Sequence, residues 1–275
     1  MAVNFYISGS MAVTAGSAML LAISLGSVAS AFSATVTPHR AFYEMQLGHA
    51  DQNSNVQAVI GRSAFTLGRD CSGWQSNEDY VVEFGGKEGD TNRIISRFKS
   101  WESDAGDMYS FEISEQSSFQ TKKDFNGYAN VTSKAGNAFF SIADDSPMKL
   151  PADTYFPMRH LNAIIDGAKK GKTILAASVF TGADPDDALL ATNTVIGSWR
   201  IEAPAARMGE LGRKGYWPVQ TAYFKPEAKV AEPEYEINYS MQSNGVVRRY
   251  DIDYGDFSII AELMKLEALA VPNCP

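Results

Sequence analysis

The feature that most constrains the fold is a series of short, β-rich runs over residues 41–142, each separated from the next by a polar turn. In YSFEI, for example, Tyr109, Phe111 and Ile113 alternate with polar residues. This alternation places the apolar side chains on one face of a strand. The intervening segments are rich in Gly, Asn and Asp, which favour turns. The pattern therefore predicts an antiparallel sheet, arranged as a sandwich, a barrel or a rolled sheet.

One segment departs from this pattern and predicts a helix around residues 157–170. Leu161 and Ile164 fall on one face at helical spacing, and Pro157 suits the first turn of a helix. After this segment the β pattern resumes. The last run, FSIIAELMKLEAL, has helical propensity as well as strand character. The residues alone therefore leave the structure of the C-terminal run open.

The N-terminal segment is typical of an export signal. Residues 1–31 contain no Asp, Glu, Lys or Arg, residues 11–25 are apolar, and an Ala-Ser-Ala tripeptide at 29–31 offers a cleavage site. We therefore expect residues 1–31 to be a cleaved signal peptide and residues 32–275 to form a single, exported β domain. The n-region lacks a basic side chain, and the alternatives are an uncleaved anchor and a buried N-terminal helix.

The chain has two cysteines, Cys71 and Cys274. Cysteines of exported proteins meet an oxidising compartment, and two cysteines allow one internal pairing. A disulfide is therefore favoured over the alternative of two separate buried thiols. His39, His49 and His160 lie near neither cysteine in the sequence, and a structural zinc site needs about four ligands. Neither a metal nor another cofactor is expected.

Motifs for catalysis are also missing from the sequence. It has no G-x-S-x-G nucleophile motif, and DGAKKGKT has Asp166 where a phosphate-binding loop needs its first glycine. His160 falls within the helical pattern, where it is interpreted as a structural hydrogen-bonding residue. The formal net charge is −8 and the densest basic cluster is short, which argues against nucleic-acid binding. No catalytic residue is predicted.

Several motifs resemble the periplasmic cell-envelope integrity β-spiral proteins of alphaproteobacteria. The more specific ones are DCSGW at residues 70–74 and FPMRHLNAIIDGAKKGK, which begins at Phe156. The others are HRAFYEMQL, SWESDAGD with YSFEI, VFTGAD and the C-terminal ALAVPNC. Together they span almost the whole chain after the predicted signal peptide.

This resemblance implies a mainly β fold, in which a single antiparallel sheet rolls into an open, barrel-like spiral with one helix. It implies a Cys71–Cys274 disulfide and favours a strand for the C-terminal run. The structural residues of the matching motifs are Trp74, Glu102, Pro157 and His160.

The function that the resemblance implies is a non-enzymatic role in cell-envelope integrity, through contact with a periplasmic tetratricopeptide-repeat protein. An alternative is a carrier of lipid, or of another apolar ligand, in the concave face of the sheet. A third alternative is an unrecognised hydrolase.

Overall fold

The computed structural model describes residues 36–118, 122–142, 147–226 and 232–274, so the predicted signal peptide lies outside the described residues. Fourteen strands and two helices follow one another along these residues. The strands are β1 (His39–Ala50), β2 (Val56–Arg69), β3 (Gly73–Gly86), β4 (Thr91–Ser103), β5 (Met108–Ser117), β6 (Lys123–Val131), β7 (Gly136–Phe140), β8 (Met148–Leu150), β9 (Ile174–Phe180), β10 (Leu189–Ile196), β11 (Trp217–Phe224), β12 (Tyr235–Met241), β13 (Val247–Asp253) and β14 (Phe257–Ala268). The helices are α1 (Pro157–Lys169) and the 3₁₀ helix η1 (Ala206–Leu211).

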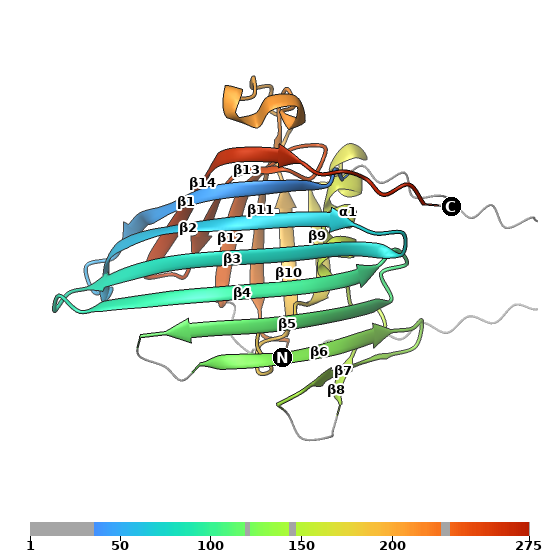
Figure 1. Cartoon of the computed structure of the whole chain (residues 1–275), viewed down its shortest axis with the longest axis horizontal. Helices are drawn as coiled ribbons and strands as arrows, with labels where there is room; N and C mark the ends of the chain where they lie inside the picture. Colours follow the sequence, from blue (N-terminus) through green and yellow to red (C-terminus); the bar gives the residue numbers. More distant parts are fainter. Residues whose placement is uncertain (1–35, 119–121, 143–146, 227–231, 275) are drawn as a thin grey trace, which may run out of the picture. The chain divides into compact units, whose positions relative to one another are not determined.

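All fourteen strands belong to one antiparallel sheet. Its order runs from β8 down to β1 and then from β14 down to β9, so the first and last strands lie side by side in the middle (Figure 1). The C-terminal run is therefore a strand, as the resemblance implied. The sheet edges, β8 and β9, are consecutive in the chain and are joined by the segment that contains α1.

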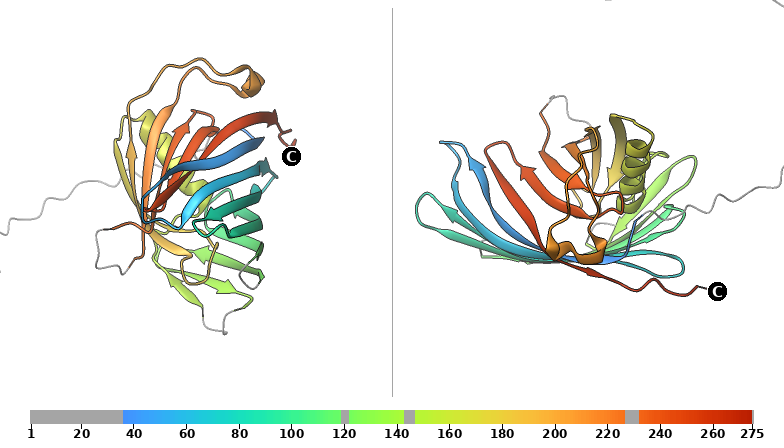
Figure 2. Two further views of the ribbon diagram at one scale, coloured as in Figure 1. Left: turned by 90° about the vertical axis from the view of Figure 1, so that its left-hand side faces the viewer. Right: turned by 90° about the horizontal axis from the view of Figure 1, so that it is seen from above.

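The sheet rolls toward a barrel within the unit Ala34–Pro275. Seen from above in Figure 2, the strands curve into an open bowl with α1 inside the curve. Contacts across the bowl agree with this view, since the Phe111 and Phe180 rings, on β5 and β9, are 5.8 Å apart. Nearby, the Tyr109 hydroxyl donates a hydrogen bond of 3.0 Å to the carbonyl oxygen of Thr181. The predicted rolled antiparallel sheet is confirmed.

The predicted alternation on β5 is also confirmed. Tyr109, Phe111 and Ile113 are buried, and the residues between them are exposed. Phe111 lies opposite Gly127 on β6, where an added Cβ would collide with the phenylalanine ring. Glycine at this position lets the large ring approach the backbone of the neighbouring strand.

The helices match the sequence-based expectation in part. The helix predicted at 157–170 is observed as α1, which ends at Lys169 and buries Ile164 and Ile165 against the sheet. The helix η1 was not predicted, because a helix this short has no periodic pattern to detect. It buries Met208 and Leu211. Neither helix in the described part of the chain is long and apolar enough to cross a membrane.

Candidate functional site

The turn between β2 and β3 is organised by one carboxylate, Asp70. One oxygen of Asp70 accepts the backbone N–H and the hydroxyl of Ser72 and the N–H of Gly73, each at 2.8 Å. The other accepts the Gln75 side-chain amide at 3.0 Å. The hydrogen bonds from Ser72 contribute most to lowering the pKa of Asp70 to about 2. The carboxylate is thus ionised over the physiological range and fixes the turn.

Cys71 lies in this turn and forms a disulfide with Cys274 in the structure, with 5.4 Å between the two Cα atoms. The bond spans 203 positions of the sequence and ties the chain end to the β2–β3 turn. Both cysteines are exposed, so solvent reductants can reach the bond.

Glu102, on β4, holds the start of α1. Its two carboxyl oxygens accept the backbone N–H groups of Met158 at 2.7 Å and Arg159 at 2.8 Å. The first N–H groups of a helix have no partner within the helix and carry a partial positive charge. The N-cap residue, Phe156, provides no side-chain cap. A carboxyl group from a distant strand therefore replaces the missing local cap.

This carboxyl group is in an unusual environment, because the Glu102 side chain is buried. Burial raises its pKa to about 7, although the N–H bonds from Met158 and Arg159 oppose the rise. Both protonation states are therefore populated near neutral pH. The two oxygens stay directed at the helix in the structure, so the group serves to position α1.

Trp74 lies directly opposite Glu102 in the β3–β4 pairing and is also buried. The Arg69 guanidinium lies over its ring, 5.0 Å from the ring centroid. Arg69 also bonds both carboxylate oxygens of Asp104 at 2.8 Å. These contacts connect β2, β3 and the turn that follows β4, next to the helix start.

His160 lies one turn into α1 and is buried. Its Nε2 atom has no hydrogen-bond partner among the described residues. Burial without a partner lowers the pKa of His160 to about 4. The imidazole is therefore neutral in the folded protein at neutral pH.

The position of His160 predicts a specific acid sensitivity. Below its ordinary pKa of 6.5, the unfolded chain binds a proton that the folded chain does not bind until about pH 4. Its contribution to stability is therefore lost as the pH falls through this window, by about 3 kcal/mol in all. Urea titrations at several pH values give the unfolding free energies of His160→Gln and of the parent. On acidification through this window, the variant should gain that amount of stability relative to the parent. A difference that stays constant with pH would contradict the buried, neutral imidazole.

The structure thus gathers most of the predicted structural residues in one place. Trp74 faces Glu102, Glu102 caps the helix that Pro157 begins, and His160 follows in that helix. Gly73, beside the disulfide turn, allows close packing, because a Cβ there would collide with the Glu102 carbonyl oxygen. We call Trp74, Glu102 and the start of α1 the capped-helix site. Sequence reasoning missed the role of Asp70, whose closest partners lie in its own turn, and that of Arg69, whose partners lie on β3 and in the turn after β4.

A Ser-His-Asp grouping elsewhere in the structure was also missed. The His49 Nδ1 atom lies 2.9 Å from the Ser258 hydroxyl, and its Nε2 atom lies 4.0 Å from Asp253. However, Ser258 is buried, and its hydroxyl also accepts the His49 backbone N–H at 3.3 Å. A buried hydroxyl on a regular strand is inaccessible to a substrate, unlike the exposed serine of a nucleophile turn. The grouping joins β1 to β14.

The described residues contain no group of three or more His, Cys, Asp or Glu side chains that could hold a metal ion. At the capped-helix site, both Glu102 oxygens bind backbone N–H groups. The site can therefore position a helix and link strands.

Fold and site together define a β-barrel-like protein whose rolled sheet carries a capped helix and a disulfide at the chain end. The chain belongs to the EipB-like family, whose model matches residues 30–270. It is 27% identical over 261 residues to the cell envelope integrity protein EipB of Brucella abortus (strain 2308), covering 93% of each chain. It is also similar to a crystal structure from Brucella abortus, described as a beta-barrel-like protein of domain of unknown function DUF1849. That match has a TM-score of 0.79 and 27% identity, and covers 86% of this chain and 99% of the other. The resemblance seen in the sequence is confirmed.

Proposed function

We propose that this chain is a periplasmic protein that supports cell-envelope integrity without catalysis, by binding another protein. The name of the similar Brucella protein supports the envelope role. The disulfide and the sequence of residues 1–31 support export through a cleaved signal peptide. The structural use of Glu102 and the burial of His160 and Ser258 support a role other than catalysis.

The observation that carries the binding proposal is a set of exposed apolar side chains around the end of β10. Val195 is 50% exposed and pairs in register with Ile174 on β9, which is 69% exposed. In the loop that follows β10, Trp199 is 38% and Ile201 is 83% exposed. We call Ile174, Val195, Trp199 and Ile201 the β10 patch. Exposed apolar residues on β9, β10 and the loop after β10 support a protein interaction site in this part of the chain.

The partner that we propose is a periplasmic tetratricopeptide-repeat protein, the class that the family resemblance implied. Such repeats stack into a superhelix with an extended concave surface. That surface would receive the loop after β10, with Trp199 and Ile201 as apolar anchors. Trp199 already packs against Trp217, with 4.5 Å between ring centroids, so it is held in place before binding.

The test is to replace Val195 and Ile201 together with aspartate. Burying two charges in an apolar interface should reduce retention of the repeat protein at least about tenfold. Capture from periplasm with purified protein, followed by mass spectrometry, measures retention, and detergent resistance of a complemented deletion strain measures function. Ile60→Asp is the control, since Ile60 is 73% exposed on β2. Unchanged retention and complementation by the double variant would contradict the proposal.

A second candidate function, an apolar-ligand carrier, rests on the inner face of the sheet. Phe65, Tyr80 and Phe84 point to this face and pack against buried core residues, yet each remains partly exposed. A lipid chain could cover them. Native mass spectrometry of protein purified without detergent would detect a retained lipid, and a ligand-free spectrum would count against the carrier function.

A further inference from the structure

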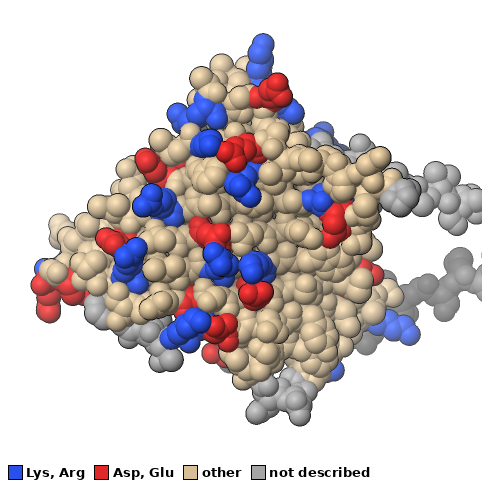
Figure 3. Space-filling view, in the orientation of Figure 1, with Lys and Arg blue, Asp and Glu red and all other residues tan. Residues whose placement is uncertain are grey.

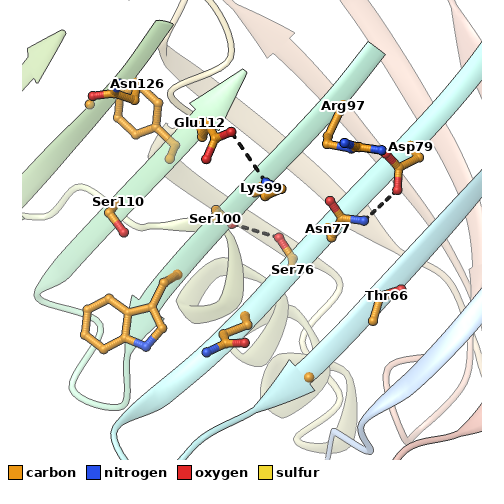
Figure 4. Close-up of a pocket in the computed structure, with 15 residues that line it drawn as sticks. Thr66, Ser76, Asn77, Asp79, Arg97, Lys99, Ser100, Ser110, Glu112 and Asn126 are labelled. Carbon is orange, nitrogen blue, oxygen red and sulfur yellow. Dashed lines mark hydrogen bonds and ion pairs between the residues drawn. The ribbon is translucent and has the colours of Figure 1, made fainter. Parts of the chain in front are cut away.

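The outer face of β2–β6 contains a shallow hollow of about 810 Å³ that neither function above explains (Figure 4). Most of the side chains that line it come from alternate positions of neighbouring strands and point away from the core, while Ser76, Ser100 and Phe111 border it from the positions between them. They include Thr66, Gln75, Asn77, Lys99, Trp101, Glu112 and Asn126. The hollow lies on a face of the sheet and not at an edge, so a partner must be recognised through side chains.

Two aromatic rings lie on this face of the sheet: Trp101 lines the hollow, and Tyr128 lies outside its lining, next to Ser110 and two positions along β6 from Asn126, both of which line it. The strand register aligns Trp101 on β4, Ser110 on β5 and Tyr128 on β6 in one row. Trp101 is half-buried, and its indole N–H donates a bond of 3.1 Å to Asp70, which fixes the ring. Tyr128 is 54% exposed and stacks on Phe139, with 4.8 Å between centroids. The backbones of Trp101 and Tyr128 are separated by two strand spacings, which amount to about 10 Å. This distance is on the order of the length of a disaccharide.

The polar groups of the hollow are balanced in charge. Asp79 pairs with Arg97, and Lys99 lies 3.4 Å from Glu112. Figure 3 shows basic and acidic side chains next to one another on this face. A polyanion would need an excess of basic groups, and a lipid would need an apolar lining. The exposed side-chain amide of Asn126 completes a surface of neutral donors and acceptors.

We propose that this hollow binds a neutral glycan chain. Sugar rings have apolar faces that pack on aromatic rings and a rim of hydroxyl groups that form hydrogen bonds. Trp101 and Tyr128 would hold successive sugar units, and Lys99, Glu112 and Asn126 would bind their hydroxyl groups. The hollow and the β10 patch share no residue. The glycan proposal can therefore be tested independently of the protein-binding proposal.

The test is isothermal titration calorimetry of the mature protein with chitohexaose, cellohexaose and solubilised cell-wall glycan strands. At least one probe should bind the parent, and Tyr128→Ala and Asn126→Ala should each weaken that binding about tenfold. Both side chains are exposed, so both variants should fold. Trp101→Phe, which keeps an aromatic ring, should weaken binding less than Tyr128→Ala.

Matched controls come from outside the hollow. Asn238 is exposed on β12 and Tyr254 is 43% exposed, so Asn238→Ala and Tyr254→Ala should bind like the parent. The proposal is overturned if none of the three probes binds, or if Tyr128→Ala and Asn126→Ala bind as tightly as the controls. Loss of a protein partner in the Tyr128→Ala and Asn126→Ala variants, without glycan binding by the parent, would instead assign the hollow to a protein.

Discussion

Replacing both Cys71 and Cys274 with serine is expected to lower the free energy of unfolding by up to about 5 kcal/mol. The bond closes a loop of 203 positions, so its loss restores much conformational freedom to the unfolded chain. This figure is an upper bound, since disulfides commonly contribute less than the loop model gives. Differential scanning calorimetry should show a fall in Tm on the order of 10 °C.

Reduction of the parent protein provides the matched experiment. Because both cysteines are exposed, a reductant should lower the Tm of the parent to that of the double variant and leave the variant unchanged. Limited proteolysis should release only residues after Ala268. Residues before this point should resist cleavage, because β14 is paired on both sides, by β1 and β13. A parent protein that keeps its Tm in reductant would contradict this role of the disulfide.

Replacing Glu102 with alanine is expected to cost about 3 kcal/mol of unfolding free energy near pH 5. The change leaves the N–H groups of Met158 and Arg159 without acceptors and opens a cavity beside Trp74. The unfolding free energy should be measured near pH 5. At higher pH the buried carboxyl group of the folded protein ionises, and this ionisation lowers the stability of the parent. Urea titration followed by tryptophan fluorescence gives the value.

Two further variants distinguish the loss of the Glu102 helix cap from the loss of a carboxylate charge. Glu83→Ala removes an exposed carboxylate on β3, paired with Arg93 at 3.6 Å, and should change stability by less than about 1 kcal/mol. In the parent, the raised pKa of Glu102 makes its contribution to stability fall as the pH rises from 4.5 to about 7. Glu102→Gln should remove that part of the pH dependence. Equal losses in Glu102→Ala and Glu83→Ala would refute the capping role.

Local patterns in the sequence predicted local structure well. Alternation on β5 predicted which side chains are buried, and helical spacing with Pro157 located α1. The residues alone could not settle the C-terminal run, because FSIIAELMKLEAL suits either a strand or a helix. What decides its structure is pairing with β1, more than two hundred residues earlier in the chain, which no local propensity reflects.

The candidate site was harder to predict than the fold. Motif resemblance selected Glu102 and His160, but nothing in the sequence placed the Glu102 carboxyl group at the N-terminus of α1. The sequence also gave no sign that Asp70 would bond to Trp101, or Ser258 to His49, because each pair joins different strands. Such contacts depend on strand order and register, which the alternation pattern leaves undetermined.

Export and the disulfide that secures the rolled sheet can be tested together. Intact-mass spectrometry after thiol alkylation tests both directly, using protein isolated from the periplasm and alkylated in denaturant so that buried thiols also react. The account predicts a chain that begins at Phe32, takes up no label before reduction and takes up two labels after it. A chain that retains residues 1–31, or that labels both Cys71 and Cys274 without reduction, would contradict it.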